Sequence, residues 1–401
     1  MTLDFDAWHR RLADTVLATP IGRLAARDVR DAAPFAWRLP DGRAWRFMPA
    51  ADRLRVEPGA DAPVVAVLDE AAWRDFVAEL ATAAGLVYGR RVTFAAGAYA
   101  DLERWEPALR ALASGRPIFD PDAVDLRDRA GGRLDLRRAF TLDEPVEELR
   151  HFLHQTGFAL VRGVFDRDEV ARLREIVERR QALAAPGDGH SWWARRGDGE
   201  PVLCRLIYLG LVEPRIAALG DDPRLRRLAG LADEPLRVAV DRADGHSVVL
   251  KHAGVVEGLS DLPWHRDCGL GGHPLTCPLI NLGVQLDAAT AASGHLVFAP
   301  GTWRASCHRA DLARAPTVAV DTEPGDCTVH FGDAMHAAPP PTGAGPGGGR
   351  CTSAVSLELG AFAHPPAAAT TTRSWRASGR SAPGACSPRR RLRSCARGGR
   401  A

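Results

Sequence analysis

The sequence of 401 residues lacks the long hydrophobic runs that mark membrane proteins and secretory leaders. No stretch reaches about 18 consecutive apolar residues, the length that spans a bilayer. The opening residues, MTLDFDAWHRRLADTV, have no apolar core behind a basic end, unlike a signal peptide. The eight cysteines include no CxxC pair and are too scattered for a zinc ribbon, and a chain of this size needs no disulfide framework. We therefore expect a cytoplasmic protein in a reducing compartment.

A net excess of basic charge is also lacking outside the C-terminal end. Nine arginines and no acidic residue follow Pro365, so the preceding part carries a net charge of −7 against +2 for the whole chain. This distribution gives no case for nucleic-acid binding through a basic face. Lys251 is the single lysine, which reflects either a specific need for lysine or chance in an arginine-biased sequence. Hydrophobic residues at 46% and charged residues at 25% are typical of a globular protein with a sizeable core.

Residues 1–120 are predicted to form a small α+β accessory domain. Short apolar runs bounded by turn residues predict strands, and apolar residues at helical spacing predict two helices, the second carrying Leu102, Trp105, Leu109 and Leu112 and ending at Gly115. The expected strands are Ala44–Pro49, Leu54–Glu57 and Val64–Leu68, and the first helix is expected over Glu70–Ala83, capped by Asp69. Residues 121–140, with proline, glycine and alternating charges, are predicted to be a linker.

Residues 141–360 are predicted to form a second, mainly β domain. It opens with a helix at Pro145–Thr156, an apolar strand at Gly157–Val164, and a helix capped by Asp166 that runs to Arg180. Many short strand-like runs parted by glycine and proline then favour a jelly roll: Leu236–Val240, Ser247–Lys251, Leu279–Leu286, His295–Ala299, Cys327–Phe331 and Thr352–Leu359. Residues 361–401, rich in arginine, alanine, serine and proline without periodicity, are predicted to be a disordered tail.

The sequence Trp-His-Arg-Asp ending at Asp267 is the strongest chemical signal. In an extended strand His265 and Asp267 point to the same face, so both can reach one metal ion. His336 lies 71 residues after His265, far enough for an adjacent strand to bring back a second imidazole. Two histidines and one carboxylate leave open positions, as in iron(II) oxygenases, although zinc accepts the same ligands. Arg350, 14 residues beyond His336, could clamp the carboxylate of a cosubstrate.

The stretch from about 145 to 360 resembles the phytanoyl-CoA dioxygenase family. The resemblance lies in GFALVRGVFDRDEVARLR, LKHAGVVEGLSDLPWHRDCG, INLGVQLDAATAASGHLVFAPGTW and GDCTVHFGDAMHAAPP followed by Arg350. It implies a double-stranded β-helix of the cupin-like, jelly-roll kind with flanking helices, iron(II) held by His265, Asp267 and His336, 2-oxoglutarate bound by Arg350, and activation of O2. Separately, WEPALRALASGRPIF is similar to the end of sterol-carrier-type lipid-binding domains, and the alternative is an accessory module without a ligand.

Several other residues of the sequence are candidates for roles near the site. Lys251 lies where the family has a strand facing the pocket, so we predict that it contacts cosubstrate or substrate. His330 is a rival metal ligand, but a strand position favours packing or hydrogen bonding for it. His252 and His273 could line the pocket or lie in surface loops, and His295 is expected to lie in the core or to bond a metal ligand without being one. Trp303 is expected to serve packing, and a nucleophilic role is not expected for Cys268. Trp192 and Trp193 form either part of a lid or an exposed loop.

The sequence thus predicts an iron(II)- and 2-oxoglutarate-dependent dioxygenase that hydroxylates a small molecule and releases succinate and CO2. Because Asp267 fills the position that an alanine or glycine would leave open to halide, hydroxylation is favoured over halogenation. The alternatives are a metal-dependent cupin-type enzyme that does not use 2-oxoglutarate and a non-catalytic small-molecule-binding protein. Arg350 argues against the first alternative, because an enzyme without 2-oxoglutarate needs no clamp for its carboxylate. The intact set of metal ligands argues against the second, because a binding protein has no use for an open metal site.

Overall fold

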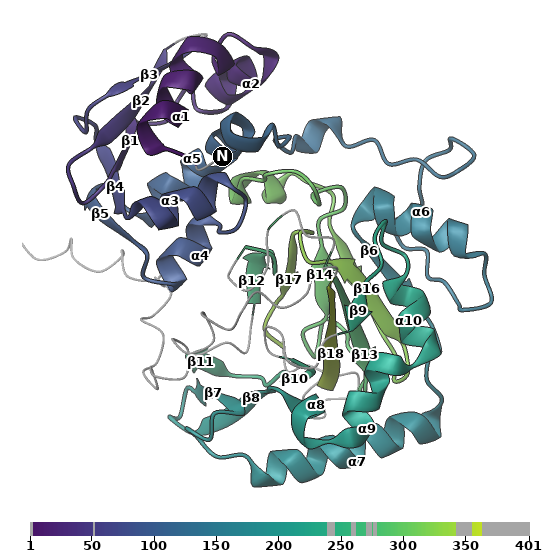
Figure 1. The fold of residues 1–401 in the computed structure, drawn as a ribbon. Coiled ribbons are helices and arrows are strands. Elements are labelled where there is room, and N and C mark those ends of the chain that lie inside the picture. The colour runs from purple at the N-terminus through teal and green to yellow at the C-terminus, as the bar shows by residue number, and fades with distance from the viewer. Residues whose placement is uncertain are drawn as a thin grey trace, which may run out of the picture.

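The computed structural model describes residues 3–50, 53–238, 245–257, 262–269, 275, 279–341 and 355–362. Residues 3–119, the N-terminal unit, hold a five-stranded sheet in the order β3-β2-β1-β4-β5, in which β1 and β4 are parallel and the other pairs antiparallel. Figure 1 shows the helices of this unit beside its sheet. The elements are α1 (Phe5–Arg11), η1 (Leu12–Val16), α2 (Pro20–Asp28), β1 (Phe35–Arg38), β2 (Ala44–Ala50), β3 (Arg53–Pro58), β4 (Val64–Leu68), α3 (Glu70–Val77), α4 (Ala83–Tyr88), β5 (Val92–Ala96) and α5 (Tyr99–Ser114).

The helix predicted over Glu70–Ala83 is wrong in its second half. α3 begins at Glu70, with Asp69 as its N-cap, but ends at Val77. Glu79 then adopts a left-handed φ of 61°, and α4 starts afresh with Thr82 as its cap. The break turns the Glu79 carboxylate toward the buried guanidinium of Arg110 on α5, with Nη1 and Oε2 2.9 Å apart. Leaving the buried guanidinium of Arg110 unpaired would cost more free energy than breaking the helix.

Aromatic side chains fill the core of the N-terminal unit, and one histidine is buried among them. The His9 ring centroid lies 4.5 Å from that of Phe5, 4.8 Å from Trp8 and 5.4 Å from Trp45. Nδ1 donates to the carbonyl of Phe5 at 2.7 Å, whereas Nε2 has no hydrogen-bond partner among the described residues. Burial therefore lowers the pKa of His9 from 6.5 to about 4.

This burial predicts an acid-sensitive N-terminal unit. Above pH 6.5 the His9 imidazole is neutral in both the folded and the unfolded chain, so it adds no pH dependence. Between pH 6.5 and 4 the unfolded chain binds a proton that the folded chain does not, and the free energy of unfolding falls by about 3 kcal/mol in total. Urea unfolding at several pH values should show a shallower acid loss for His9→Phe. Equal slopes for the two proteins would contradict the prediction.

The second domain contains a nine-stranded and a four-stranded sheet, and all their strand pairs are antiparallel. The large sheet has the order β11-β7-β8-β10-β18-β13-β16-β6, with β9 paired to β18, and the small one has the order β12-β17-β14-β15. The elements are η2 (Pro121–Ala123), α6 (Val146–Thr156), β6 (Phe158–Val161), α7 (Arg167–Leu183), β7 (Ser191–Arg196), β8 (Pro201–Leu206), α8 (Leu209–Val212), α9 (Pro214–Ala217), η3 (Ala218–Asp221), α10 (Pro223–Ala229), β9 (Arg237–Val238), β10 (Ser247–Leu250), β11 (Val255–Glu257), β12 (Leu262–His265), β13 (Ile280–Gln285), β14 (Leu296–Phe298), η4 (Arg309–Ala313), β15 (Val318–Val320), β16 (Cys327–Phe331), β17 (His336–Ala338) and β18 (Val355–Phe362).

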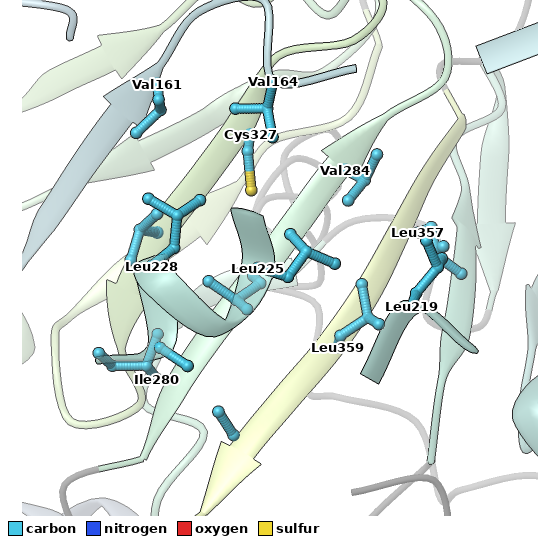
Figure 2. Packing of buried hydrophobic residues seen from close by; sticks show 14 of the residues in the cluster. Val161, Val164, Leu219, Leu225, Leu228, Ile280, Val284, Cys327, Leu357 and Leu359 are labelled. Atoms are coloured by element: carbon cyan, nitrogen blue, oxygen red, sulfur yellow. The ribbon is translucent and has the colours of Figure 1, made fainter. Parts of the chain in front are cut away.

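Alternation along the strands separates a helix-covered face of the large sheet from an inner face. Ile280, Leu282 and Val284 of β13 belong to the main core, in which residues of β16 and β18 pack against α10 (Figure 2). The residues between them, such as Asn281, point to the opposite face. There the two sheets meet, since Phe158 of β6 stacks on Phe298 of β14 with ring centroids 4.5 Å apart. The arrangement is the antiparallel jelly roll with flanking helices that the sequence predicts.

The structure of this domain differs from two further expectations. The segment with Trp192 and Trp193 was predicted to be a lid or an exposed loop, but both lie in β7, which pairs with β8. β18 runs to Phe362, two residues beyond the predicted domain end, and residues 363–401 of the predicted tail lie outside the described residues. Among the residues that the structure describes, no helix has the length and apolar character needed to cross a bilayer.

Candidate metal centre

Two neighbouring strands of the small sheet bring His265 and His336 together. His265 ends β12 and His336 begins β17, and the antiparallel register pairs the two residues directly. Their ring centroids are 4.2 Å apart. β17 is fixed from its other side by β14, where Phe298 pairs with His336. The return across 71 residues that the sequence predicts is therefore made by strand pairing.

Backbone carbonyls fix the tautomer of both imidazoles. Nδ1 of His265 lies 2.8 Å from the carbonyl oxygen of Pro263, and Nδ1 of His336 lies 3.0 Å from that of Ala334. A carbonyl oxygen can only accept, so each Nδ1 carries the proton and each Nε2 keeps its lone pair. This is the arrangement in which a hydrogen-bonded histidine presents its other nitrogen to a metal.

Asp267 reaches the same point by a turn and not by the extended strand that the sequence predicts. β12 ends at His265, after which the Asp267 N–H donates to the Gly332 carbonyl at 2.8 Å and the Cys268 N–H to the same oxygen at 3.1 Å. A Cβ at Gly332 would lie 2.5 Å from Leu279 Cδ2 and 2.8 Å from Cys268 Sγ, so a larger residue here would displace one of these side chains. The turn is thus held by the segment that leads to His336.

The three side chains form a compact donor set. Asp267 Oδ1 lies 3.5 Å from His265 Nε2, and Oδ2 lies 3.7 Å from His336 Nε2. One donor atom from each residue lies within 4.8 Å of the others. Two imidazole nitrogens and a carboxylate oxygen suit a divalent iron, zinc or related ion, so these residues fit the metal that the sequence leads us to expect.

The charge states of the donors also suit a cation. Burial opposes ionisation of Asp267, but the imidazoles of His336, His265 and His330 outweigh it and hold the pKa of the carboxyl well below its usual value. Burial, with the neighbouring His265, lowers the pKa of His336 from 6.5 to about 3. At neutral pH Asp267 is therefore a carboxylate and His336 a neutral imidazole, the forms that bind metals.

Asn281 and His330 hold the Asp267 carboxylate from the inner face of the large sheet. Asn281 Nδ2 donates to Oδ2 at 2.5 Å, and His330 Nε2 lies 3.3 Å from the same oxygen. His330, the rival ligand, is thus placed behind the carboxylate, in agreement with the expected hydrogen-bonding role. Asn281 was missed by the sequence reasoning, although a polar residue within the apolar strand LINLGVQL is a signal for an inward-facing group.

Replacing Asn281 by leucine is expected to weaken metal binding about 10–100-fold, because a ligating carboxylate loses the donor that orients it. Isothermal titration with Co(II) under anaerobic conditions measures the change. Gln285→Leu is the matched control, since Gln285 lies on the same strand and face but bonds the carbonyl of Gly283 at 3.4 Å. Equal affinities for wild type and Asn281→Leu would contradict this role.

The two predicted cosubstrate residues have different outcomes. Arg350 lies outside the described residues. Lys251 is buried just after β10, and its Nζ donates to the carbonyl of Ala338 at 2.8 Å, two residues beyond His336. β18, which follows Arg350, starts at Val355 opposite Leu250. The strand that follows the arginine therefore starts beside the lysine.

Three of the remaining candidates have partners other than the three donors. His295 bonds Asp321 at 2.7 Å, His252 bonds the Leu203 carbonyl at 2.7 Å, and Trp303 stacks on Phe331 with centroids 4.0 Å apart. Cys268, the residue after Asp267, is buried and forms no disulfide in the described part of the chain. His273 lies outside the described residues.

Comparison with known proteins finds one matching family model and several similar solved structures. Residues 153–346 match the sequence model of the family described as phytanoyl-CoA dioxygenase. No curated protein matches the chain. Similar solved structures include AviO1 from Streptomyces viridochromogenes Tue57, at 25% identity and a TM-score of 0.43 over 55% of this chain and 96% of that one.

Two other similar structures were solved with ligands. The epimerase SnoN from nogalamycin biosynthesis, in complex with Fe3+, alpha ketoglutarate and nogalamycin RO, is 20% identical with a TM-score of 0.42, over 54% of this chain and 83% of that one. EctD from S. alaskensis, with 2-oxoglutarate and 5-hydroxyectoine, is 17% identical with a TM-score of 0.44, over 62% of this chain and 86% of that one.

Proposed function

Since residues 153–346 belong to the phytanoyl-CoA dioxygenase family, we propose that the chain is an iron(II)- and 2-oxoglutarate-dependent oxygenase. The observation that carries the proposal is the donor set of His265, Asp267 and His336, whose ligand atoms lie within 4.8 Å of one another. Two imidazoles and one carboxylate leave positions free for a chelating 2-oxo acid and for O2. The fixed Nε2 lone pairs and the ionised carboxylate support the same assignment.

Each protein group has a defined part in this scheme. Iron with 2-oxoglutarate supplies the oxidative chemistry, in which O2 is consumed, 2-oxoglutarate becomes succinate and CO2, and a substrate C–H bond is hydroxylated. His265 and His336 hold the metal through Nε2, and Asp267 supplies the negative charge. Asn281 and His330 keep the carboxylate turned toward the metal.

Arg350 and Lys251 are proposed to serve the cosubstrate. A guanidinium can hold the far carboxylate of 2-oxoglutarate through two parallel hydrogen bonds, with the 2-oxo acid end on the metal. The pairing of Val355 with Leu250 starts β18 next to Lys251, which supports a shared location. Lys251 also anchors the strand of His336 through Ala338, so its charge lies near the proposed cosubstrate site.

Turnover of 2-oxoglutarate tests the proposal directly. The purified chain with Fe(II), 2-oxoglutarate and O2 should form succinate, and omission of iron or oxygen should stop it. Asp267→Ala should lose this activity, whereas Asp287→Ala, at a carboxylate paired with Arg174 near the other end of β13, should keep it. An iron-loaded, folded chain that never consumes 2-oxoglutarate would overturn the proposal and favour a cupin-type enzyme that works without this cosubstrate.

A further inference from the structure

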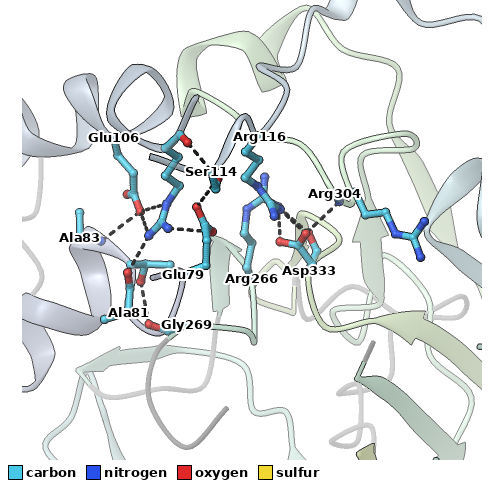
Figure 3. A network of polar contacts seen from close by, with 12 residues as sticks. Glu79, Ala81, Ala83, Glu106, Ser114, Arg116, Arg266, Gly269, Arg304 and Asp333 are labelled. Carbon is cyan, nitrogen blue, oxygen red and sulfur yellow. Dashed lines mark hydrogen bonds and ion pairs between the residues drawn. The ribbon is translucent and has the colours of Figure 1, made fainter. Parts of the chain in front are cut away.

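Both segments that carry the metal ligands are attached to the N-terminal unit, at two separate places (Figure 3). The first attachment is the carboxylate of Asp333, three residues before His336. It accepts hydrogen bonds from the guanidinium groups of Arg116 and Arg266, the latter at 2.5 Å, and from the Arg304 N–H at 2.8 Å. Arg116 follows α5 of the N-terminal unit, and Arg266 lies between His265 and Asp267. One carboxylate therefore joins three parts of the chain.

Burial restricts how the side chains of Arg116, Arg266 and Asp333 can be arranged. The side chains of Arg116 and Asp333 are each 5% exposed and that of Arg266 is 10% exposed, so water cannot replace a lost partner. Arg266 also donates to the Asp333 carbonyl at 2.6 Å and to the Ala305 carbonyl at 2.6 Å. A buried carboxylate shared by two guanidinium groups has few alternative arrangements, because each displaced charge would be left unpaired.

The second attachment holds the residues directly after Asp267. The Gly269 carbonyl accepts from the Thr82 N–H at 2.9 Å and from the Thr82 hydroxyl at 3.1 Å, and the Leu275 N–H donates to the Glu79 carbonyl at 2.7 Å. Gly269 has a left-handed φ of 78°, and a Cβ there would lie 2.6 Å from Thr82 Cγ2. The loop behind the metal carboxylate is thus closely fitted to the start of α4.

A buried ion network keeps this receiving segment in place. Arg110, on α5, bonds Glu79 at 2.9 Å, Glu106 at 2.8 Å and the Ala81 carbonyl at 2.7 Å. Glu106 in turn accepts from the Ala83 N–H at 3.1 Å. The segment from Glu79 to Ala83 is therefore tied to α5, the same helix that leads into Arg116. Both attachments are therefore connected to α5, one through its buried ion network and the other through the residues that follow it.

We propose that the N-terminal unit positions the metal ligands, with Arg116 and Thr82 as the positioning residues. The inference rests on the proposed metal centre and assigns the unit a role in it, in place of a detachable accessory module. Arg116 sets the segment of His336 through Asp333, and the same carboxylate sets Arg266 between the other two ligands. Thr82 sets the backbone after Asp267. Loosening either contact should weaken metal binding although no ligand is changed.

Metal affinity of full-length variants tests this positioning role without 2-oxoglutarate or turnover. Co(II) is the probe, titrated anaerobically and followed by calorimetry and by its visible absorption, which reports ligand geometry. Arg116→Met should bind Co(II) several-fold more weakly and show a shifted spectrum, because Asp333 then no longer holds the segments of the ligands in place. Arg116→Lys should recover part of the affinity, because it restores a charge to Asp333.

A contact between the same two units but away from the ligands supplies the control. Asp28 on α2 pairs with His308 at 2.6 Å and with Arg104 at 3.4 Å. Asp28→Asn should leave Co(II) affinity and spectrum at wild-type values. Thr82→Val, which loses the hydroxyl but keeps its shape, carries the test if Arg116→Met does not fold, and a loss of several-fold is expected.

The outcomes separate this inference from the proposed function. A wild-type chain that binds no Co(II) overturns the metal centre itself, and the positioning role with it. Wild-type binding with unchanged affinity in folded Arg116→Met or Thr82→Val overturns the positioning role alone. Equal weakening by Asp28→Asn also overturns it, since the effect would then belong to association of the units in general.

Discussion

The His265→Ala variant is expected to lose at least about 100-fold in affinity for Fe(II) or Co(II). The estimate is a lower bound, because loss of an outer partner alone costs about 10–100-fold and this change removes a donor atom. His265 lies at the end of β12, with 21% of its side chain exposed, so its removal leaves no large buried cavity. The metal-free variant should therefore fold and melt like wild type.

Thermal unfolding with and without metal measures this loss. Metal at about 100 times the dissociation constant adds about 2.7 kcal/mol to the stability of a protein that binds it only when folded. For a domain of this size the gain corresponds to a rise of about 5–10 °C in Tm, which His265→Ala should not show. His295→Ala is the control, since His295 also pairs with a carboxylate, that of Asp321 at 2.7 Å, but away from the centre. A full metal-induced shift in His265→Ala would contradict its role as a ligand.

Replacing Arg110 by leucine is expected to lower the free energy of unfolding by about 3–5 kcal/mol, the cost of breaking a buried ion pair. Arg110 is 1% exposed and Glu79 4% exposed, so the variant leaves a buried carboxylate without its counter-charge. Urea unfolding of the full chain measures the change. The effect should extend to the metal centre, because Arg110 also holds the Ala81 carbonyl beside Thr82.

Two comparisons show whether the unpaired charge is the cause. The triple variant Arg110→Leu, Glu79→Leu, Glu106→Leu should recover much of the lost stability, because a buried ion pair is often replaceable by apolar side chains. Arg30→Leu should change stability very little, since Arg30 and Asp31 are 66% and 81% exposed. A loss in Arg110→Leu as small as that in Arg30→Leu would contradict the buried-network interpretation.

The sequence predicted the parts of the fold that depend on local pattern. α5 ends where Gly115 takes a left-handed φ of 76°, and Asp166 caps α7 with Glu169 as its capping-box partner. Cys327–Phe331 is a strand with the bounds that its apolar run indicates. Such features are decided within a few residues, by turn chemistry and hydrophobic periodicity.

Features decided by contacts distant in sequence were not predictable. The break at Glu79 depends on Arg110, 31 residues later, and the anchoring of Asp333 depends on Arg116, 217 residues earlier. β7, with its two tryptophans, exists because β8 and β11 pair with it. No periodicity in these segments indicates their partners, because a buried charge or an edge strand finds its position only in the folded chain.

The candidate site lies between these two cases. His265, Asp267 and His336 could be selected because few combinations of residue types suit a metal, and the structure brings all three together. The turn that delivers Asp267 could not be foreseen, since it depends on the carbonyl of Gly332. The role of Asn281 could not be predicted either, although its strand was. The sequence does not show that Asp267 lies in front of this side chain and accepts its hydrogen bond.

The most direct test of the central claim is an anaerobic titration of the full chain with Fe(II) and 2-oxoglutarate, followed by visible absorption. The proposed centre predicts a weak charge-transfer band from iron to bound 2-oxoglutarate, absent in His265→Ala and weakened in Arg350→Ala. No band from a folded, iron-loaded wild-type chain would contradict the claim that His265, Asp267 and His336 form an iron site for 2-oxoglutarate.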